Sequence, residues 1–112
     1  MVSARRKRSM DSVLREAIAQ RRLVSFVLDG RRRVGEPHDY GLTGGEPRLF
    51  FYQTGGESRS GRPSGWRWAV LSKMSDLKVL DGRFPGPRPA PSGRHVSWDV
   101  LFASVSSGLR SR

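Results

Sequence analysis

Hydrophobic and polar residues alternate near the start of the chain in a way that predicts a β-hairpin. Val24, Phe26 and Leu28 recur at every second position, the period of a strand with one buried face. Asp29-Gly30 follows, a dipeptide that adopts positive φ angles at little cost and therefore suits a two-residue turn. The returning strand carries three arginines. We expect it to end at Pro37, because proline has no amide hydrogen to donate to a ladder.

A helix is predicted upstream of the hairpin, over residues 11–22. Its apolar positions recur at helical spacing and form a single stripe, which would cover one end of a small β-structure. Ser9, Asp11 and Ser12 each carry a side-chain oxygen that could cap the first turn. The residues of the stripe are Val13, Leu14, Ala17 and Ile18.

Three further short strands are predicted after the hairpin, at residues 48–53, 66–71 and 77–80. Residues 38–47 contain three glycines and indicate a loop, and residues 54–65 indicate a longer one. Five short strands preceded by one helix predict a mainly β fold. The expected architecture is a small five-stranded barrel, although the strand pattern is shared by several kinds of antiparallel barrel.

The C-terminal part of the chain predicts a spacer followed by a short helix. Residues 85–95 are rich in proline, which is typical of a semi-rigid spacer. Residues 96–105 regain apolar character, and a helix of this length must dock, on its own sheet or on a second subunit, because it is too short to be stable alone. The expected organisation is a basic arm (1–9), a folded domain (10–84), the spacer, and the helix with a polar tail (96–112). The apolar side of that helix would consist of Trp98, Leu101, Phe102 and Val105.

The charge of the chain predicts a polyanionic partner. The 112 residues carry a net charge of +11, and residues 1–33 hold ten basic and three acidic residues. Clustered cations gain affinity for nucleic acid by neutralising phosphates and releasing counterions. The alternative is that the arginines reflect genomic base composition and lie on solvated faces. Apolar residues make up only 36% of the chain, so much of it is expected to be turn or tail.

Other features of the composition narrow the class of protein. The chain has no cysteine, so it contains no disulfide and no thiolate metal site. No segment approaches the roughly 20 apolar residues that span a bilayer. We therefore expect a soluble, cytoplasmic protein without a membrane partner.

Several segments resemble the WYL domain of bacterial transcriptional regulators. One matching segment is residues 33–38, where an arginine precedes a valine and a proline, and the resemblance covers about residues 13–84. It implies an Sm-like or SH3-like barrel that binds a ligand or oligonucleotide in a regulatory role. The chain departs from the family in places: of the three eponymous positions only Leu49 survives, Leu28 stands where a tyrosine is frequent, and Lys73-Met74 replaces Arg-Ile. The other matching segments are Leu49-Phe50-Phe51-Tyr52-Gln53, Gly65-Trp66-Arg67, Leu71-Ser72-Lys73-Met74 and Leu77-Lys78-Val79-Leu80-Asp81.

Candidate binding residues come from two sources. The resemblance implies a ligand surface that includes Arg33, His38, Arg67 and Lys73. The residues themselves add Arg31, which shares a strand face with Arg33, and the flat rings of Tyr52 and Trp66, which could stack on bases or belong to the core. Hydroxyl groups in the predicted loop at residues 54–65 could bind phosphate. These loop residues are Ser58 and Ser60.

Catalysis has little support in the sequence. His38 and His95 lack metal-ligand spacing, and no serine lies in a nucleophile elbow. We therefore expect a non-catalytic module without a cofactor, which binds nucleic acid or a related anionic ligand. Two alternatives stay open: a sensor of a small nucleotide-like anion, and a module for oligomerisation or for binding a partner regulator through residues 96–105.

Overall fold

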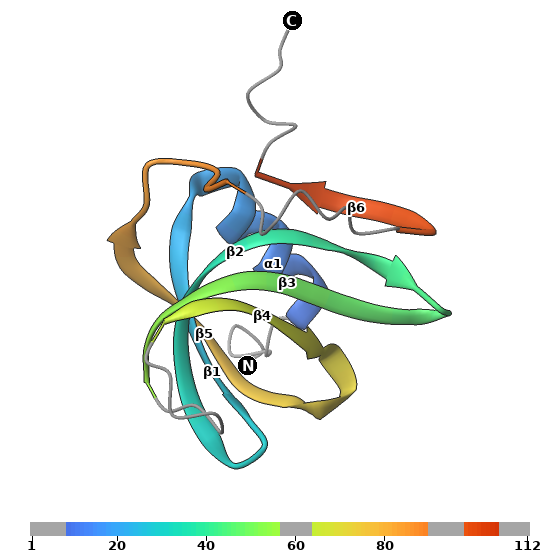
Figure 1. Cartoon of the computed structure of the whole chain (residues 1–112), viewed down its shortest axis with the longest axis horizontal. Coiled ribbons are helices and arrows are strands. Elements are labelled where there is room, and N and C mark those ends of the chain that lie inside the picture. The colour runs from blue at the N-terminus through green and yellow to red at the C-terminus, as the bar shows by residue number, and fades with distance from the viewer. Residues whose placement is uncertain (1–8, 57–63, 90–97, 106–112) are drawn as a thin grey trace, which may run out of the picture.

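One antiparallel sheet of six strands, with a helix at its N-terminal end, makes up the fold (Figure 1). The computed structural model describes residues 9–56, 64–89 and 98–105. The mainly β class is confirmed, whereas the closed five-stranded barrel is wrong: the sheet is open, with the order β4-β3-β2-β1-β5 and with β6 added beside β2. The elements are α1 (Met10–Gln20), β1 (Arg22–Leu28), β2 (Arg31–Thr43), β3 (Glu46–Gly56), β4 (Gly65–Val70), a 3-10 turn η2 (Leu71–Lys73), β5 (Met74–Arg83) and β6 (Val100–Ser104).

The helix α1 forms where its apolar stripe predicted it. Ser9 caps its N-terminus by accepting a hydrogen bond of 3.1 Å from the amide of Ser12. It ends at Arg21, which adopts a left-handed conformation with φ 55° and donates its amide hydrogen to the last turn. All four residues of the stripe are buried, and the helix packs against β1, β2, β5 and β6.

The hairpin between β1 and β2 is confirmed. Asp29 and Gly30 have φ angles of 56° and 72°, the pair of positive values that a type I′ turn requires. Leu28 lies directly opposite Arg31 across this turn. The local turn chemistry therefore determines the register of the first two strands.

The prediction that the second strand ends at Pro37 is wrong, because β2 continues to Thr43. Along one edge β2 pairs with β1 as far as Gly35, and from Asp39 onward with β6. Pro37 lies between these two partners, where no ladder on that edge needs its amide hydrogen. A β-bulge places His38 as an extra residue opposite β3, and bulges are among the few sites in a sheet that tolerate proline.

The predicted loop at residues 38–47 is therefore mostly strand. Residues 38–43 belong to β2, and β3 already begins at Glu46. Only Gly44-Gly45 forms the turn, with φ angles of 63° and 79°. Two of the three glycines that indicated a loop are the turn, and the third, Gly41, lies within β2 opposite Leu101.

The predicted C-terminal helix is wrong over the described residues 98–105, which contain the strand β6. β6 pairs with the second half of β2, with Tyr40 opposite Ala103 and Leu42 opposite Val100 (Figure 1). A segment this short gains little from an isolated helix, whereas the unoccupied edge of β2 satisfies its backbone groups. The close approach depends on Gly41, since a Cβ atom there would lie 2.2 Å from the carbonyl oxygen of Val100.

The core lies between α1 and the concave face of the sheet. Phe26 and Phe51 meet edge to face at its centre, with ring centroids 5.0 Å apart. Phe84, after β5, and Val105, after β6, extend the same apolar cluster. Burial of these side chains is the main stabilising contribution.

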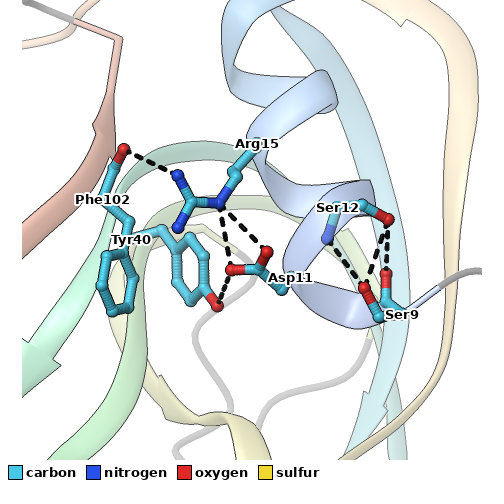
Figure 2. A network of polar contacts seen from close by, with 6 residues as sticks. All are labelled: Ser9, Asp11, Ser12, Arg15, Tyr40 and Phe102. Carbon is cyan, nitrogen blue, oxygen red and sulfur yellow. Dashed lines mark hydrogen bonds and ion pairs between the residues drawn. The ribbon is translucent and has the colours of Figure 1, made fainter.

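A polar network joins α1 to the two strands at its side (Figure 2). The Tyr40 hydroxyl on β2 donates a hydrogen bond of 2.7 Å to Asp11, which also accepts from Arg15 at 3.0 Å. The Arg15 guanidinium lies 5.0 Å from the centre of the Phe102 ring on β6. The hydrogen bond from Tyr40 and the nearby Arg15 lower the pKa of Asp11, against a smaller opposing effect of burial. Burial, and after it the hydrogen bond to Asp11, raises the pKa of Tyr40 to about 12.

Substituting Gly41→Ala should detach β6 selectively. The added methyl group has no room beside Val100, and overpacking of this kind costs about 1–3 kcal/mol. Hydrogen exchange of the β6 amides should accelerate far more than that of β1. The matched control is Gly55→Ala, where the nearest atom would lie 3.7 Å away; equal exchange of β6 in both variants would contradict the assignment.

Substituting Tyr40→Phe should make the unfolding free energy of the protein less dependent on pH in the acidic range. A carboxylate whose pKa is lowered by folding stabilises the protein above its unfolded value of 3.8, and that contribution is lost as the pH falls through the folded pKa. We expect a loss of about 1 kcal/mol in unfolding free energy at pH 7 for this partly exposed pair, shrinking towards about pH 3. Urea unfolding of the native chain and the variant at both pH values measures this loss. In the control Tyr52→Phe, which keeps Asp11 paired, the difference from the native chain should not shrink between the two pH values.

Candidate ligand-binding surface

A row of aromatic rings covers the outer face of the sheet, opposite the core. Phe50 and Tyr52 on β3 lie directly across from Trp68 and Trp66 on β4, respectively. They alternate along β3 with Leu49 and Phe51, which are fully buried in the core. The alternation of side chains along a strand therefore separates an apolar inner face from an aromatic outer face. We call the rings of Phe50, Tyr52, Trp66, Trp68 and Trp98 the outer aromatic surface.

The rings of this surface contact one another in sequence. Trp66 stacks on Phe50 with centroids 4.7 Å apart and planes 8° apart, while Tyr52 meets the edge of Trp66 at 5.4 Å. At the other end, Trp68 lies 5.4 Å from Trp98, the residue two positions before β6. Trp68 is 41% exposed, and Phe50 is buried beneath its neighbours. Offset and edge contacts of this kind hold the rings in fixed orientations.

An ion pair closes one end of the outer aromatic surface. The buried Glu36 carboxylate, directly opposite Tyr52 in the ladder, accepts hydrogen bonds of 2.6 and 3.0 Å from Nε and Nη2 of Arg88. The same guanidinium lies 3.9 Å from the centre of the Tyr52 ring. The hydrogen bond to Glu36 raises the pKa of Arg88, so this group stays cationic. A bidentate pair with a stacked ring orients Arg88 tightly.

His38 lies beside this ion pair, at the bulge of β2. Its ring meets the edge of Trp66 at 4.8 Å and stacks on Phe84 at 5.5 Å. Nδ1 lies 2.9 Å from the carbonyl oxygen of Glu36, and Nε2 accepts a hydrogen bond of 3.2 Å from the backbone amide of Arg88. Because the carbonyl can only accept and the amide can only donate, the ring is neutral with its proton on Nδ1. Burial, the largest effect, lowers the pKa of His38.

The segment at residues 84–89, which we call the strap, crosses this end of the sheet. It follows β5 and is anchored where the Phe84 amide donates a hydrogen bond of 2.9 Å to the carbonyl oxygen of Arg21. Nη1 of Arg21 in turn donates to the carbonyl oxygen of Pro85 at 2.9 Å. Residues 85–89 and Glu36 line a hollow of about 290 Å³. The strap therefore lies between solvent and the Glu36 carboxylate.

The structure brings together three of the residues predicted from the sequence. His38, Tyr52 and Trp66 contact one another as described above, on the outer face. Arg33 lies elsewhere: it is 4% exposed, its Nη1 donates to the Gln53 side chain at 3.3 Å, and it points to the inner side of the sheet. Arg33, a candidate binding residue in the sequence, is therefore buried and does not reach the outer aromatic surface.

The other predicted residues do not join this group. Arg31 begins β2 at the hairpin turn, and Lys73 is exposed in η2. Arg67 lies opposite Phe51, hence on the other side of β4 from Trp66, and its Nη1 donates to the Trp66 carbonyl oxygen at 3.3 Å. Ser58 and Ser60 fall outside the residues that the structure describes.

Around the ion pair at the end of this surface, sequence reasoning missed three residues: Glu36, Phe84 and Arg88. Glu36 precedes the proline that was expected to stop the strand, and the other two border or lie within the expected spacer. A signal was present in the triplet Pro87-Arg88-Pro89, where two prolines restrict the backbone on both sides of a lone cation. Its meaning depends on Glu36, which lies about fifty residues away along the chain.

Positive charge is distributed unevenly between the described and the remaining residues. Residues 1–8, 57–63, 90–97 and 106–112 contain nine basic and one acidic residue, so they hold eight of the eleven net positive charges. Within the described part, both arginines that flank the aromatic rings are paired: Arg88 with Glu36, and Arg48 with Glu46 at 3.4 Å. The outer aromatic surface is therefore apolar rather than strongly basic.

Two further observations concern the described residues only. They contain no group of three or more His, Cys, Asp or Glu side chains arranged to hold a metal ion. Among them, α1 is not long and apolar enough to cross a membrane, and no other helix qualifies.

Substituting Arg88→Ala should destabilise the protein by about 1–2 kcal/mol, because the Glu36 carboxylate stays buried and loses both charged donors. Urea unfolding at pH 7 measures the loss. The matched control is Arg48→Ala, which removes the other arginine beside the rings; its pair with Glu46 is exposed on both sides and should contribute less than about 0.5 kcal/mol. Equal losses of stability in the two variants would contradict the larger contribution expected of the buried Glu36 pair.

No protein-family model matches the chain, and no curated protein and no solved structure matches it. The resemblance to the WYL domain therefore stays a prediction.

Proposed function

We propose that the chain is a non-catalytic binding module that holds single-stranded nucleic acid on its outer aromatic surface, in a regulatory role. The observation that carries this proposal is the row of five rings along one face of the sheet, from Tyr52 beside Arg88 to Trp98 beside β6. A core needs rings on the inner face; these rings lie on the other face, where Trp68 is 41% exposed.

Stacking on aromatic rings suits the bases of a single strand. Every base has a flat face, so such contacts are tolerant of sequence and contribute about 1–3 kcal/mol per base. Trp68 and Trp98, tilted by 47° to each other, offer two indoles to neighbouring bases. Duplex DNA keeps its bases stacked inside the helix and cannot use these rings in this way.

Phosphate neutralisation would come mainly from outside the sheet. Eight of the eleven net positive charges lie on residues 1–8, 57–63, 90–97 and 106–112. We propose a division of labour, in which the sheet stacks bases and these segments neutralise the backbone. Affinity would then depend steeply on salt, because each phosphate contact releases counterions.

We also propose that the chain is of the WYL type, on the basis of its sheet and its leading helix. A strongly bent antiparallel sheet with a leading helix is compatible with an opened Sm-like or SH3-like barrel of the WYL type. The segments that carry the resemblance form the first half of β2, the centre of β3, the start of β4, the turn η2 and part of β5. Under this proposal His38 is the carried-over residue closest to the ligand, since Arg33 lies in the interior.

A second candidate function is self-association through β6. Val100 and Leu101 are 47% and 46% exposed, and they lie on a strand whose sequence, VLFAS, carries no charge. Edge strands with exposed apolar residues are frequent sites of strand pairing between chains. Sedimentation distinguishes the two functions, because Leu101→Ala should change the oligomeric state only if this second candidate is correct.

Fluorescence anisotropy with a labelled single-stranded oligonucleotide tests the proposed function. Trp68→Ala should weaken binding by about 1–3 kcal/mol through the loss of one stacked base. The slope of log affinity against log salt should be about −3 or steeper in the intact chain, at roughly −0.7 per phosphate contact, and unchanged in the variant, which removes no charge.

The matched control is Leu101→Ala, which truncates an apolar residue of similar exposure that is not one of the five rings and should leave the affinity unchanged. Removing residues 1–8, with their four basic residues, should instead flatten the slope by up to about 3. A chain that binds duplex as well as single strands, or binding that ignores salt, would overturn the proposal.

A further inference from the structure

We propose that the strap is a latch that closes one end of the outer aromatic surface and opens when His38 gains a proton. The latch regulates the site named above and rests on the proposed function for its purpose, although its opening is a property of the free protein. Three sets of contacts carry the inference: those that hold the tip of the strap, those that anchor its root, and those around the histidine ring.

Within residues 86–89, the hydrogen bonds and the ion pair to other described residues all come from Arg88. Its guanidinium binds Glu36 through two hydrogen bonds and lies over the Tyr52 ring at 3.9 Å. Its backbone amide donates to Nε2 of His38 at 3.2 Å. While these contacts persist, Arg88 occupies the face of Tyr52 that a base would stack on, and the same guanidinium is unavailable to a phosphate.

The root of the strap is anchored independently of Arg88. Phe84 is 4% exposed in the core and bonds to the carbonyl oxygen of Arg21, and the Arg21 guanidinium binds Pro85. Gly86 follows with a φ angle of 143°, a value that residues with a side chain rarely adopt. The glycine separates a fixed root from a tip whose hydrogen bonds come from Arg88, so release of Arg88 can move the tip without unfolding the sheet.

Protonation of His38 removes the acceptor that the tip needs. The neutral ring donates from Nδ1 to the carbonyl oxygen of Glu36 and accepts at Nε2. In the imidazolium ion both nitrogens carry hydrogen, so Nε2–H would face the Arg88 amide, donor against donor, beside a second cation. A buried contact of this kind is unfavourable, and moving the tip relieves it.

Burial of the ring and the charges around it set the pH at which this happens. From β2, Glu36 and Asp39 favour the imidazolium ion; from the strap, Arg88 opposes it; β4 contributes only the uncharged Trp66. Burial is the largest effect, and it moves the pKa below the ordinary 6.5. Once Arg88 leaves, the Glu36 carboxylate lies beside an imidazolium ion, so it exchanges one cationic partner for another.

Nuclear magnetic resonance of the full chain without nucleic acid tests the latch. Between about pH 8 and about pH 5, the Arg88 amide and the Tyr52 ring signals should shift with the same midpoint as the His38 ring, below 6.5. In His38→Gln, whose side-chain oxygen can still accept near the position of Nε2 without titrating, the shift should disappear. In His38→Phe, which keeps the stack on Phe84 and has no acceptor, the tip should be released at both pH values.

The outcomes separate the latch from the proposed function. An Arg88 amide that does not follow the His38 ring, or that shifts equally in His38→Gln, overturns the latch, whatever the chain binds. If oligonucleotide affinity rises between pH 8 and pH 5 more in the native chain than in His38→Gln, both proposals are supported. A coupled transition in a chain that binds no oligonucleotide supports the latch and overturns only the proposed function.

Discussion

Pro37 has no amide hydrogen, and the organisation of the sheet depends on where β2 places that residue. Among the strands that the structure describes, β2 is the only one with three partners: β3 along one edge, and β1 and then β6 along the other. Pro37 lies at the change of partner, where a missing donor costs least, and the bulge at His38 restores the alternation of faces beyond it. Without this arrangement β2 would stop, β6 would have no edge to join, and Trp98 would not meet Trp68.

The same strand separates two chemically different faces. Arg33 and Pro37 point towards the interior, while Glu36 lies opposite Tyr52 on the outside. A buried carboxylate requires a charged partner, and the strap supplies Arg88 from a segment that follows β5. The bulged His38 then lies between sheet and strap and touches both. The candidate site is thus a consequence of how β2 is paired, and its polar members hold each other in place.

Features that depend on neighbours in the chain could be predicted from the sequence. Ser9 caps α1, the apolar stripe is buried, and Asp29-Gly30 turns with two positive φ angles, because each of these depends on a few consecutive residues. Pro37 misled the prediction because the usual rule assumes that both edges of a strand are paired at every position. Residues 98–105 misled it as well, because a short apolar segment suits a helix or a strand, and only the free edge of β2 decides between them.

The sequence by itself determined the mainly β class, the leading helix, the first hairpin, and a positive charge that lies mostly on residues outside the described sheet. It also identified Tyr52 and Trp66 as candidates, because flat rings can stack on bases, and the resemblance to the WYL domain added His38. Only the tertiary structure decided which arginines matter. Arg33 points inward because of strand alternation, whereas Arg88 pairs with Glu36, about fifty residues away along the chain. Contacts between residues so far apart in the sequence depend on the packing of the whole sheet rather than on any local pattern.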